Sequence, residues 1–222
     1  MRLQTSAWLV GGLALLLSAA GTLGQGTFQN LDFENGTFIP ISGDPFGRVE
    51  WTPAMPGWTG YIGTIQQSLI SLNSLSLSAA NIAIMGPDFP SPGLFHGQYY
   101  VVLQNSFPVA TDVPAISQVG MVPVGSQTIQ FWTGDQYAVG FGVSYGGHQI
   151  SLSQLGSTAN GRWMWGGDVS AFAGQTGELR FRGNGYLDNI QFSDQPIPAP
   201  GVFGLSALGA LLLGCRVLGR RR

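Results

Sequence analysis

Between residues 25 and 195 the sequence breaks into short runs in which apolar and polar residues alternate, and glycine, proline, asparagine or aspartate separates the runs. Because successive side chains of a β-strand point to opposite faces, this spacing predicts strands with one buried and one wet side. Ile129 and Phe131, for example, share one face of such a run, and polar residues occupy the other. Leu179 and Phe181 likewise face away from Arg180 and Arg182, which lie on the wet side. The sequence therefore predicts one all-β domain, an antiparallel jelly-roll β-sandwich over residues 25–195.

Eight runs are clear strand candidates. They are Gln98 to Gln104, Ala115 to Met121, Gln127 to Thr133, Tyr137 to Ser144, His148 to Ser153, Arg162 to Val169, Glu178 to Arg182 and Tyr186 to Phe192. Residues 64–85 are rich in serine and leucine and fit either a strand or a short helix. Residues 40–56 and 85–97 are dense in proline and glycine and are predicted to be long surface loops, where sandwiches often carry their binding sites.

Charge is scarce in this chain and unevenly placed. Charged residues make up 9% of the sequence, and five of the nine arginines lie in the two terminal segments. The residues between these segments hold four arginines against all eleven carboxylates, so the central domain is acidic. An acidic surface repels phosphate backbones, which argues against a nucleic-acid partner. The only cysteine, Cys215, lies near the C-terminus, so the domain has neither a disulfide nor a thiolate metal site.

The first 24 residues predict a secretion signal. Arg2 supplies a positive start, and residues 8–17 form an apolar run too short for a confident membrane span. Small residues follow, with cleavage by signal peptidase expected after Ala20 or Gly24. An uncleaved membrane anchor is the alternative interpretation.

The last 27 residues, 196–222, have three parts: a proline-rich junction, an apolar stretch and a basic cluster. The apolar stretch is just long enough for a single hydrophobic helix across a bilayer, and arginines at its end would remain cytoplasmic. This layout resembles the PEP-CTERM sorting signal. The residues that carry the resemblance are Pro198, Ala199, Pro200, Arg216, Arg220, Arg221 and Arg222.

The PEP-CTERM resemblance implies that the tail holds the protein transiently in the inner membrane. An exosortase would then cleave it, leaving the protein at the cell surface or in the extracellular matrix. Ala199 stands where the usual Pro-Glu-Pro motif has its acidic residue. An ordinary C-terminal membrane anchor is the alternative.

A second resemblance concerns the two ends of the domain. Residues 30–36, Asn-Leu-Asp-Phe-Glu-Asn-Gly, and residues 186–192, Tyr-Leu-Asp-Asn-Ile-Gln-Phe, resemble the first and last strands of galactose-binding-like jelly rolls. Many carbohydrate-binding modules have that fold. The resemblance implies that both ends of the domain lie side by side and that a structural Ca²⁺ is held there.

Asp188 is the most informative carboxylate, because strand alternation places it on the face of its strand that should look into the core. A carboxylate is not left unpaired in such a place. It would bind Ca²⁺ at the rim with Asp32 and Glu34, since this ion takes several oxygen ligands, or pair with an arginine such as Arg162. A plain hydrogen-bonded or solvated role is the alternative for these carboxylates.

Four tryptophans are candidates for glycan binding, because sugars stack their C–H faces on indole rings. Trp163 and Trp165 share one strand face and could form a platform, whereas Trp51 and Trp58 lie in a predicted loop. Packing in the core is the alternative for each ring.

Signals for catalysis are weak. Residues 142–146 match the G-x-S-x-G nucleophile elbow, but only His148 follows as a base, so a hairpin is the better interpretation. His96 and His148 show no zinc-ligand spacing. Paired carboxylates for glycoside hydrolysis depend on the fold and cannot be read from one chain.

These observations predict an exported, non-catalytic surface or extracellular-matrix protein that binds glycan or another extracellular polymer. The alternatives are a secreted polysaccharide hydrolase or lyase, and a purely structural adhesive protein.

Overall fold

The computed structural model describes residues 26–89, 96–107, 112–134, 141–158 and 161–197. The predicted signal peptide and sorting tail, including Pro198 and the terminal arginines, lie outside these ranges. Within them, none of the helices combines the length and the apolar character that a membrane crossing requires.

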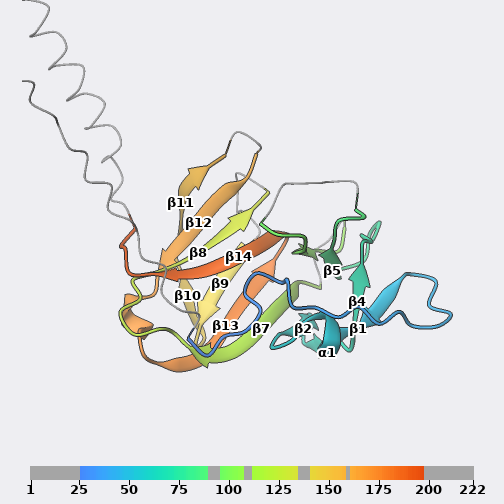
Figure 1. Ribbon diagram of the computed structural model, residues 1–222, viewed down its shortest axis with the longest axis horizontal. Helices are drawn as coiled ribbons and strands as arrows, with labels where there is room; N and C mark the ends of the chain where they lie inside the picture. Colours follow the sequence, from blue (N-terminus) through green and yellow to red (C-terminus); the bar gives the residue numbers. More distant parts are fainter. Residues whose placement is uncertain (1–25, 90–95, 108–111, 135–140, 159–160, 198–222) are drawn as a thin grey trace, which may run out of the picture.

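Two β-sheets contain about half of the described residues and form a sandwich-like arrangement, which confirms the all-β prediction (Figure 1). The larger sheet has the strand order β1 (Arg48–Glu50), β4 (Leu69–Leu72), β5 (Asn81–Met85), β6 (Tyr100–Gln104), β14 (Gly185–Ser193), β8 (Thr128–Thr133), β12 (Trp163–Asp168) and β11 (Leu152–Ser157). The smaller sheet has the order β10 (His148–Ile150), β9 (Phe141–Tyr145), β13 (Thr176–Gly183), β7 (Pro114–Met121), β2 (Thr59–Ile62) and β3 (Ile65–Gln66). Among the described strand pairs, β4 with β5 is parallel and the rest are antiparallel.

The main core lies between the two sheets and is built from the apolar faces that the alternation predicts. Ile129 and Phe131 of β8 are buried from one side, and Leu179 and Phe181 of β13 from the other. The rings of Phe131 and Phe181 meet edge to face, with centroids 5.4 Å apart. Each such side chain, once fully buried, contributes about 1.5–3 kcal/mol to folding.

Where the structure describes them, the predicted strands agree with it except at residues 148–153 and in the N-terminal segment. Residues 137–140 of the predicted strand Tyr137 to Ser144, and residues 90–95 of the predicted loop 85–97, lie outside the described ranges. Residues 148–153 are not one strand: the chain leaves the smaller sheet after β10 and enters the larger sheet with β11. The open question over residues 64–85 resolves into the strands β3, β4 and β5.

The prediction of a surface loop over residues 40–56 is wrong for its second half. This part contains β1 and a short helix, α1 (Trp51–Ala54). Val49, Trp51 and Ala54 are buried, and their burial orders a segment whose proline and glycine content suggested a loop.

The N-terminal segment does not form the predicted first strand. Residues 31–35 form turns, and Asn30 and Phe33 have φ angles of 49° and 60°, in the left-handed region that strands do not use. The segment nevertheless lies beside the last strand, because the N–H of Ile190 donates to the carbonyl oxygen of Leu31 at 2.9 Å. The predicted adjacency of the two ends of the domain is therefore present.

A β-bulge in β14 changes which way Asp188 points. Asn189 has a φ of 48°, and the register with β8 shifts between Asp188 and Gln191. Leu187 and Ile190 both enter the main core, three residues apart instead of two. The prediction that Asp188 shares a face with Ile190 is therefore wrong, because a bulge inserts a residue and reverses the alternation beyond it.

Candidate functional site

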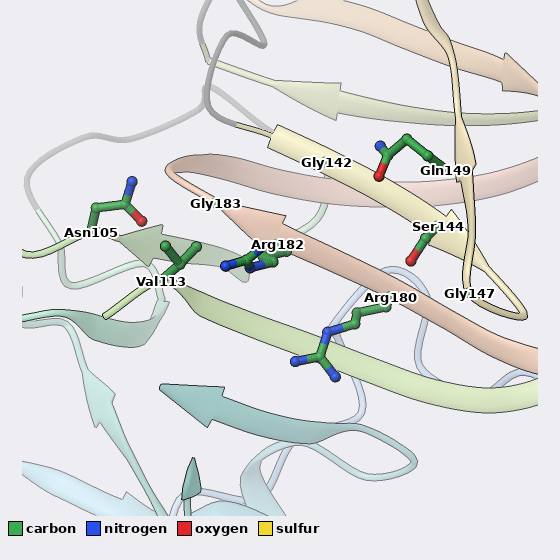
Figure 2. Close-up of a pocket in the computed structure, with 9 residues that line it drawn as sticks. All are labelled: Asn105, Val113, Gly142, Ser144, Gly147, Gln149, Arg180, Arg182 and Gly183. Carbon is green, nitrogen blue, oxygen red and sulfur yellow. The ribbon is translucent and has the colours of Figure 1, made fainter. Parts of the chain in front are cut away.

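The outer face of the smaller sheet carries a pocket of about 510 Å³, which we call the sheet-face pocket (Figure 2). Strands β9, β10 and β13 and the turn between the first two supply most of its lining, and two loop residues close one side. The lining residues are Asn105, Val113, Gly142, Ser144, Gly147, Gln149, Arg180, Arg182 and Gly183.

Strand alternation explains why polar side chains gather on this face. Leu179 and Phe181 of β13 are buried in the core, so Arg180 and Arg182 point outward. In β9, likewise, the buried Val143 and Tyr145 leave the residues between and before them facing out.

The strand register then brings these outward residues together. Ser144 stands opposite Arg180 on one side and Gln149 on the other, so the three form one row across the strands. Gly142 stands opposite Arg182 in the neighbouring row. Directly opposed residues have Cβ atoms about 4.5–5.5 Å apart, close enough to contact one ligand.

Gly142 keeps the pocket hollow. A Cβ at this position would lie 3.5 Å from Nε2 of Gln149 and 3.8 Å from the carbonyl oxygen of Arg182, which are ordinary contacts. The backbone thus accepts a side chain here, but any side chain longer than alanine would extend into the cavity.

Two arginines give the pocket positive charge. Arg180 lies 3.5 Å from a Glu178 oxygen, and its guanidinium carbon is 4.7 Å from the centroid of the Tyr61 ring. Arg182 is exposed and makes no ion pair with any residue that the structure describes. No carboxylate is among the residues that line the pocket, and Glu178, which approaches Arg180, lies outside that lining.

The G-x-S-x-G match forms a hairpin, as predicted. Gly146 and Gly147 connect β9 to β10 with φ angles of 55° and 81°, the conformation of a type I′ turn. Ser144 faces the sheet-face pocket, where its strand neighbours are an arginine and a glutamine. The histidines are placed elsewhere: His96 uses its backbone N–H to bond Asp188, and the ring of His148 lies 5.9 Å from that of Phe172.

Two of the four candidate tryptophans belong to the core. Trp51 and Trp58 are each 4% exposed, and their indole N–H groups donate to the carbonyl oxygens of Trp58 and Asn30. Rings this buried do not fit the glycan stacking predicted for them, because a sugar needs an exposed face. The alternative of core packing describes both.

The other two tryptophans share a face of β12, as predicted. Trp165 is half-buried and packs against the main core, so this shared face is the inner one. Trp163, also half-buried, stands at the start of the strand opposite Thr133 and is not among the side chains packed on that core. A role for Trp163 in stacking stays a prediction.

The three candidate metal ligands lie near one another around the segment 96–99. Asp188 is fully buried and accepts the backbone N–H groups of His96 and Asn189 at 2.8 and 2.6 Å. Glu34 accepts those of Gln98 and Tyr99 at 2.7 and 2.8 Å. The carboxylates therefore hold this segment against β14 and the N-terminal segment.

The electrostatics at Asp188 are unfavourable for a charged carboxylate. Burial raises the pKa of Asp188 to about 8, and the nearby charges of Glu34 and Asp32 raise it as well. The two backbone N–H donors act in the opposite direction without cancelling the effect of burial. An acid with this pKa is mostly protonated at pH 7 unless a cation replaces the proton.

Calcium at these carboxylates fits only in part. Among the described residues, no group of three or more His, Cys, Asp or Glu side chains is arranged to hold a metal ion. Ca²⁺ also takes backbone carbonyl oxygens and water, so an ion beside Asp188 and Glu34 would need such ligands to complete its shell. The calcium site stays a prediction.

Sequence reasoning missed the sheet-face pocket as a site. It placed Arg180 and Arg182 on the wet side of their strand but gave no neighbours for them. Two features of the sequence could have indicated this pocket. They are the Arg-x-Arg spacing in a domain with four arginines and Ser144 in a glycine-rich hairpin. Strand order, which alternation does not encode, was the missing information.

Comparisons with known proteins add only a general likeness. No family model and no curated protein matches the chain. An apo-form cyclase from Fischerella sp. has a TM-score of 0.38 and 14% identity, covering 78% of this chain and 97% of that one. A cyclase from Fischerella sp. TAU has the same TM-score and identity, covering 82% and 100%.

The enzymatically active domain of tailspike protein 4 from Bacteriophage CBA120 also has a TM-score of 0.38, with 12% identity, covering 75% of this chain and 21% of that chain. Similarity at this level is a distant likeness in β-architecture and carries nothing about activity. The chain is thus an all-β, sandwich-like protein with an arginine-bearing pocket on one sheet face.

Proposed function

We propose that this protein is an exported, non-catalytic glycan-binding protein whose sugar site is the sheet-face pocket. The observation that carries the proposal is the pocket itself, whose volume of about 510 Å³ falls in the range of small-molecule sites.

The chemistry of the lining suits a polyhydroxylated ligand. Ser144 and the amide groups of Asn105 and Gln149 can each donate and accept hydrogen bonds, as sugar hydroxyls also do. The two arginines add donors in fixed forks. The bare backbone at Gly142 lets a sugar ring approach the floor of the pocket.

Export and sorting rest on the sequences of the two ends. The apolar run after Arg2 supports secretion, and the proline junction with the terminal arginines supports a cleavable tail. We propose that signal peptidase and an exosortase-like protease process these ends, leaving the domain on the cell surface or in the extracellular matrix.

A polysaccharide panel tests the binding half of the proposal. Full-length purified protein is expected to bind at least one immobilised glycan, and Gln149→Ala is expected to weaken that binding about three- to tenfold through loss of a hydrogen bond. Gln154→Ala, an exposed glutamine on β11 of the other sheet, is the matched control and should bind like the wild type.

An assay for cleavage products on the same samples distinguishes binding from catalysis. Incubating the wild-type protein with each bound polysaccharide should release no new reducing ends or unsaturated products. Release of either product would support the alternative of a secreted hydrolase or lyase. Absence of binding to every glycan would contradict the proposal and favour the purely structural, adhesive alternative.

A further inference from the structure

The sheet-face pocket holds two of the four arginines of an otherwise acidic domain. Arg180 and Arg182 are two residues apart on one strand, so their Cα atoms are about 7 Å apart and both face the same cavity. Figure 2 shows the two arginine side chains on one side of the pocket and Ser144 with Gln149 on the other.

The charge of Arg182 has no counter-ion within the described chain. Its guanidinium group is exposed, and the described ion pairs involve other residues. Arg180 is only loosely compensated, since Glu178 is 3.5 Å away and both side chains remain partly in solvent. An exposed ion pair at this distance contributes at most about 1 kcal/mol to stability. A ligand can therefore replace Glu178 as the partner of Arg180.

Strand geometry also leaves space in front of these charges. Gly142 is the strand neighbour of Arg182, and the absence of a side chain there opens the pocket beside the guanidinium group. Ser144 occupies the equivalent position beside Arg180 and adds a hydroxyl. An anionic group could thus meet an arginine fork while the rest of the sugar contacts Ser144 and Gln149.

We infer that the sheet-face pocket selects acidic glycans, in which a sugar unit carries a carboxylate or a sulfate group. This inference rests on the proposed function and specifies its ligand class. A guanidinium group binds an anionic oxygen pair through two parallel hydrogen bonds, roughly twice as strong as neutral ones. The domain as a whole is acidic and repels polyanions in general, so an acidic glycan would be attracted mainly at this pair of arginines.

The test compares full-length wild-type protein with two charge-matched variants. Arg182→Gln removes a positive charge from the pocket. Arg48→Gln removes one from β1 of the larger sheet, where Arg48 pairs with Asp44 of the preceding loop. Binding is measured to polygalacturonate, dextran sulfate, neutral dextran and single-stranded DNA. Arg182 is exposed, so the variant should keep the wild-type melting temperature.

We expect tight binding to polygalacturonate or dextran sulfate, with the better of the two identifying the anionic group. Arg182→Gln should weaken it about tenfold or more, as expected for a lost charge-assisted contact, whereas Arg48→Gln should not. Added salt should weaken the wild-type interaction, because exposed charges are screened over about 10 Å at 0.1 M ionic strength.

Other outcomes overturn the inference in distinguishable ways. Binding to neutral glycans alone would reject the acidic class and leave the proposed glycan function intact. Equal losses in the two variants would mean non-specific attraction, and tighter binding to DNA would point to a nucleic-acid partner. Binding to no glycan would reject the proposed function and the inference together.

Discussion

Asp188 lies on the face of its strand opposite to the one that simple alternation predicts. It is fully buried, yet it belongs to the outer side of the larger sheet and is covered by the segment 96–99. Its two hydrogen bonds come from backbone N–H groups, which favour the ionised form, while burial and two neighbouring carboxylates oppose it. The proton on this side chain is consequently linked to folding.

Stability without metal should fall as the pH rises from 5 to 8. In this range the unfolded chain has lost the Asp188 proton, with a pKa near 3.8, while the folded state keeps it up to about 8. The folded state therefore binds more protons, and the free energy of unfolding decreases with pH until it levels above 8. Urea unfolding in the presence of a chelator measures this slope.

Asp188→Asn should flatten this dependence. Asp168→Asn is the control, because hydrogen bonds from Ser170 lower the pKa of Asp168, which is then ionised in both states across this range. A wild-type stability that is constant or increases between pH 5 and 8 would contradict the account of Asp188.

The proposed binding of Ca²⁺ near Asp188 leads to a separate prediction for the melting temperature. If the ion binds beside Asp188 and Glu34, it competes with the proton and raises the melting temperature more at pH 8 than at pH 5. Asp188→Ala should remove the effect. Identical melting curves in chelator and in millimolar Ca²⁺ at pH 8 would leave the hydrogen-bonded role as the whole explanation for these carboxylates.

At the scale of elements, Trp58 joins the N-terminal segment to the smaller sheet. Its indole N–H donates to the carbonyl oxygen of Asn30 at 3.0 Å, and its ring centroid lies 5.7 Å from Phe33 and 6.2 Å from Phe181. This ring fixes a segment that consists of turns and has no strand ladder of its own. Core packing, rather than ligand binding, accounts for its position.

Trp58→Ala should therefore cost about 3–5 kcal/mol of folding free energy, the range for truncating a buried aromatic ring. Trp163→Ala, at a half-buried ring outside the core cluster, should cost clearly less. Denaturant unfolding of both variants gives the comparison. Equal losses would contradict the assignment of Trp58 to the core.

The alternation of apolar and polar residues was sufficient to locate most strands of both sheets, since burial of one face imposes that pattern. It could not locate the bulge at Asn189, which depends on a single backbone conformation with a φ of 48°. It also could not locate the passage between sheets at Ser151, because apolar and polar residues alternate in the same way in either sheet. The short strand β1 was hidden by its proline-rich and glycine-rich surroundings.

The candidate site was less accessible to sequence reasoning than the strands. Alternation put Arg180 on the wet side of its strand, but only the register of β9 with β13 makes Ser144 its neighbour. The sequence predicted that Asp32, Glu34 and Asp188 lie near one another at the two ends of the domain. It did not predict that Glu34 and Asp188 hold the segment 96–99.

At the scale of the whole molecule, the two ends and the domain have separate roles. The ends direct export and sorting in our proposal, and the domain binds. Protein recovered from the cell exterior should begin near Gln25 and end near Pro198, as measured by mass spectrometry of the intact chain. External protein that retains Arg220 and its neighbours would contradict cleavage of the tail.

The central claim is that glycan binds in the sheet-face pocket, and filling the pocket tests it most directly. Gly142→Leu places a side chain in the cavity, while Gly156→Leu on β11 is the matched control, since a Cβ there meets only Met164 at 3.9 Å. With both variants folded, the account predicts that Gly142→Leu abolishes binding to the glycan that the wild type prefers and that Gly156→Leu retains it. Undiminished binding by Gly142→Leu would contradict the account.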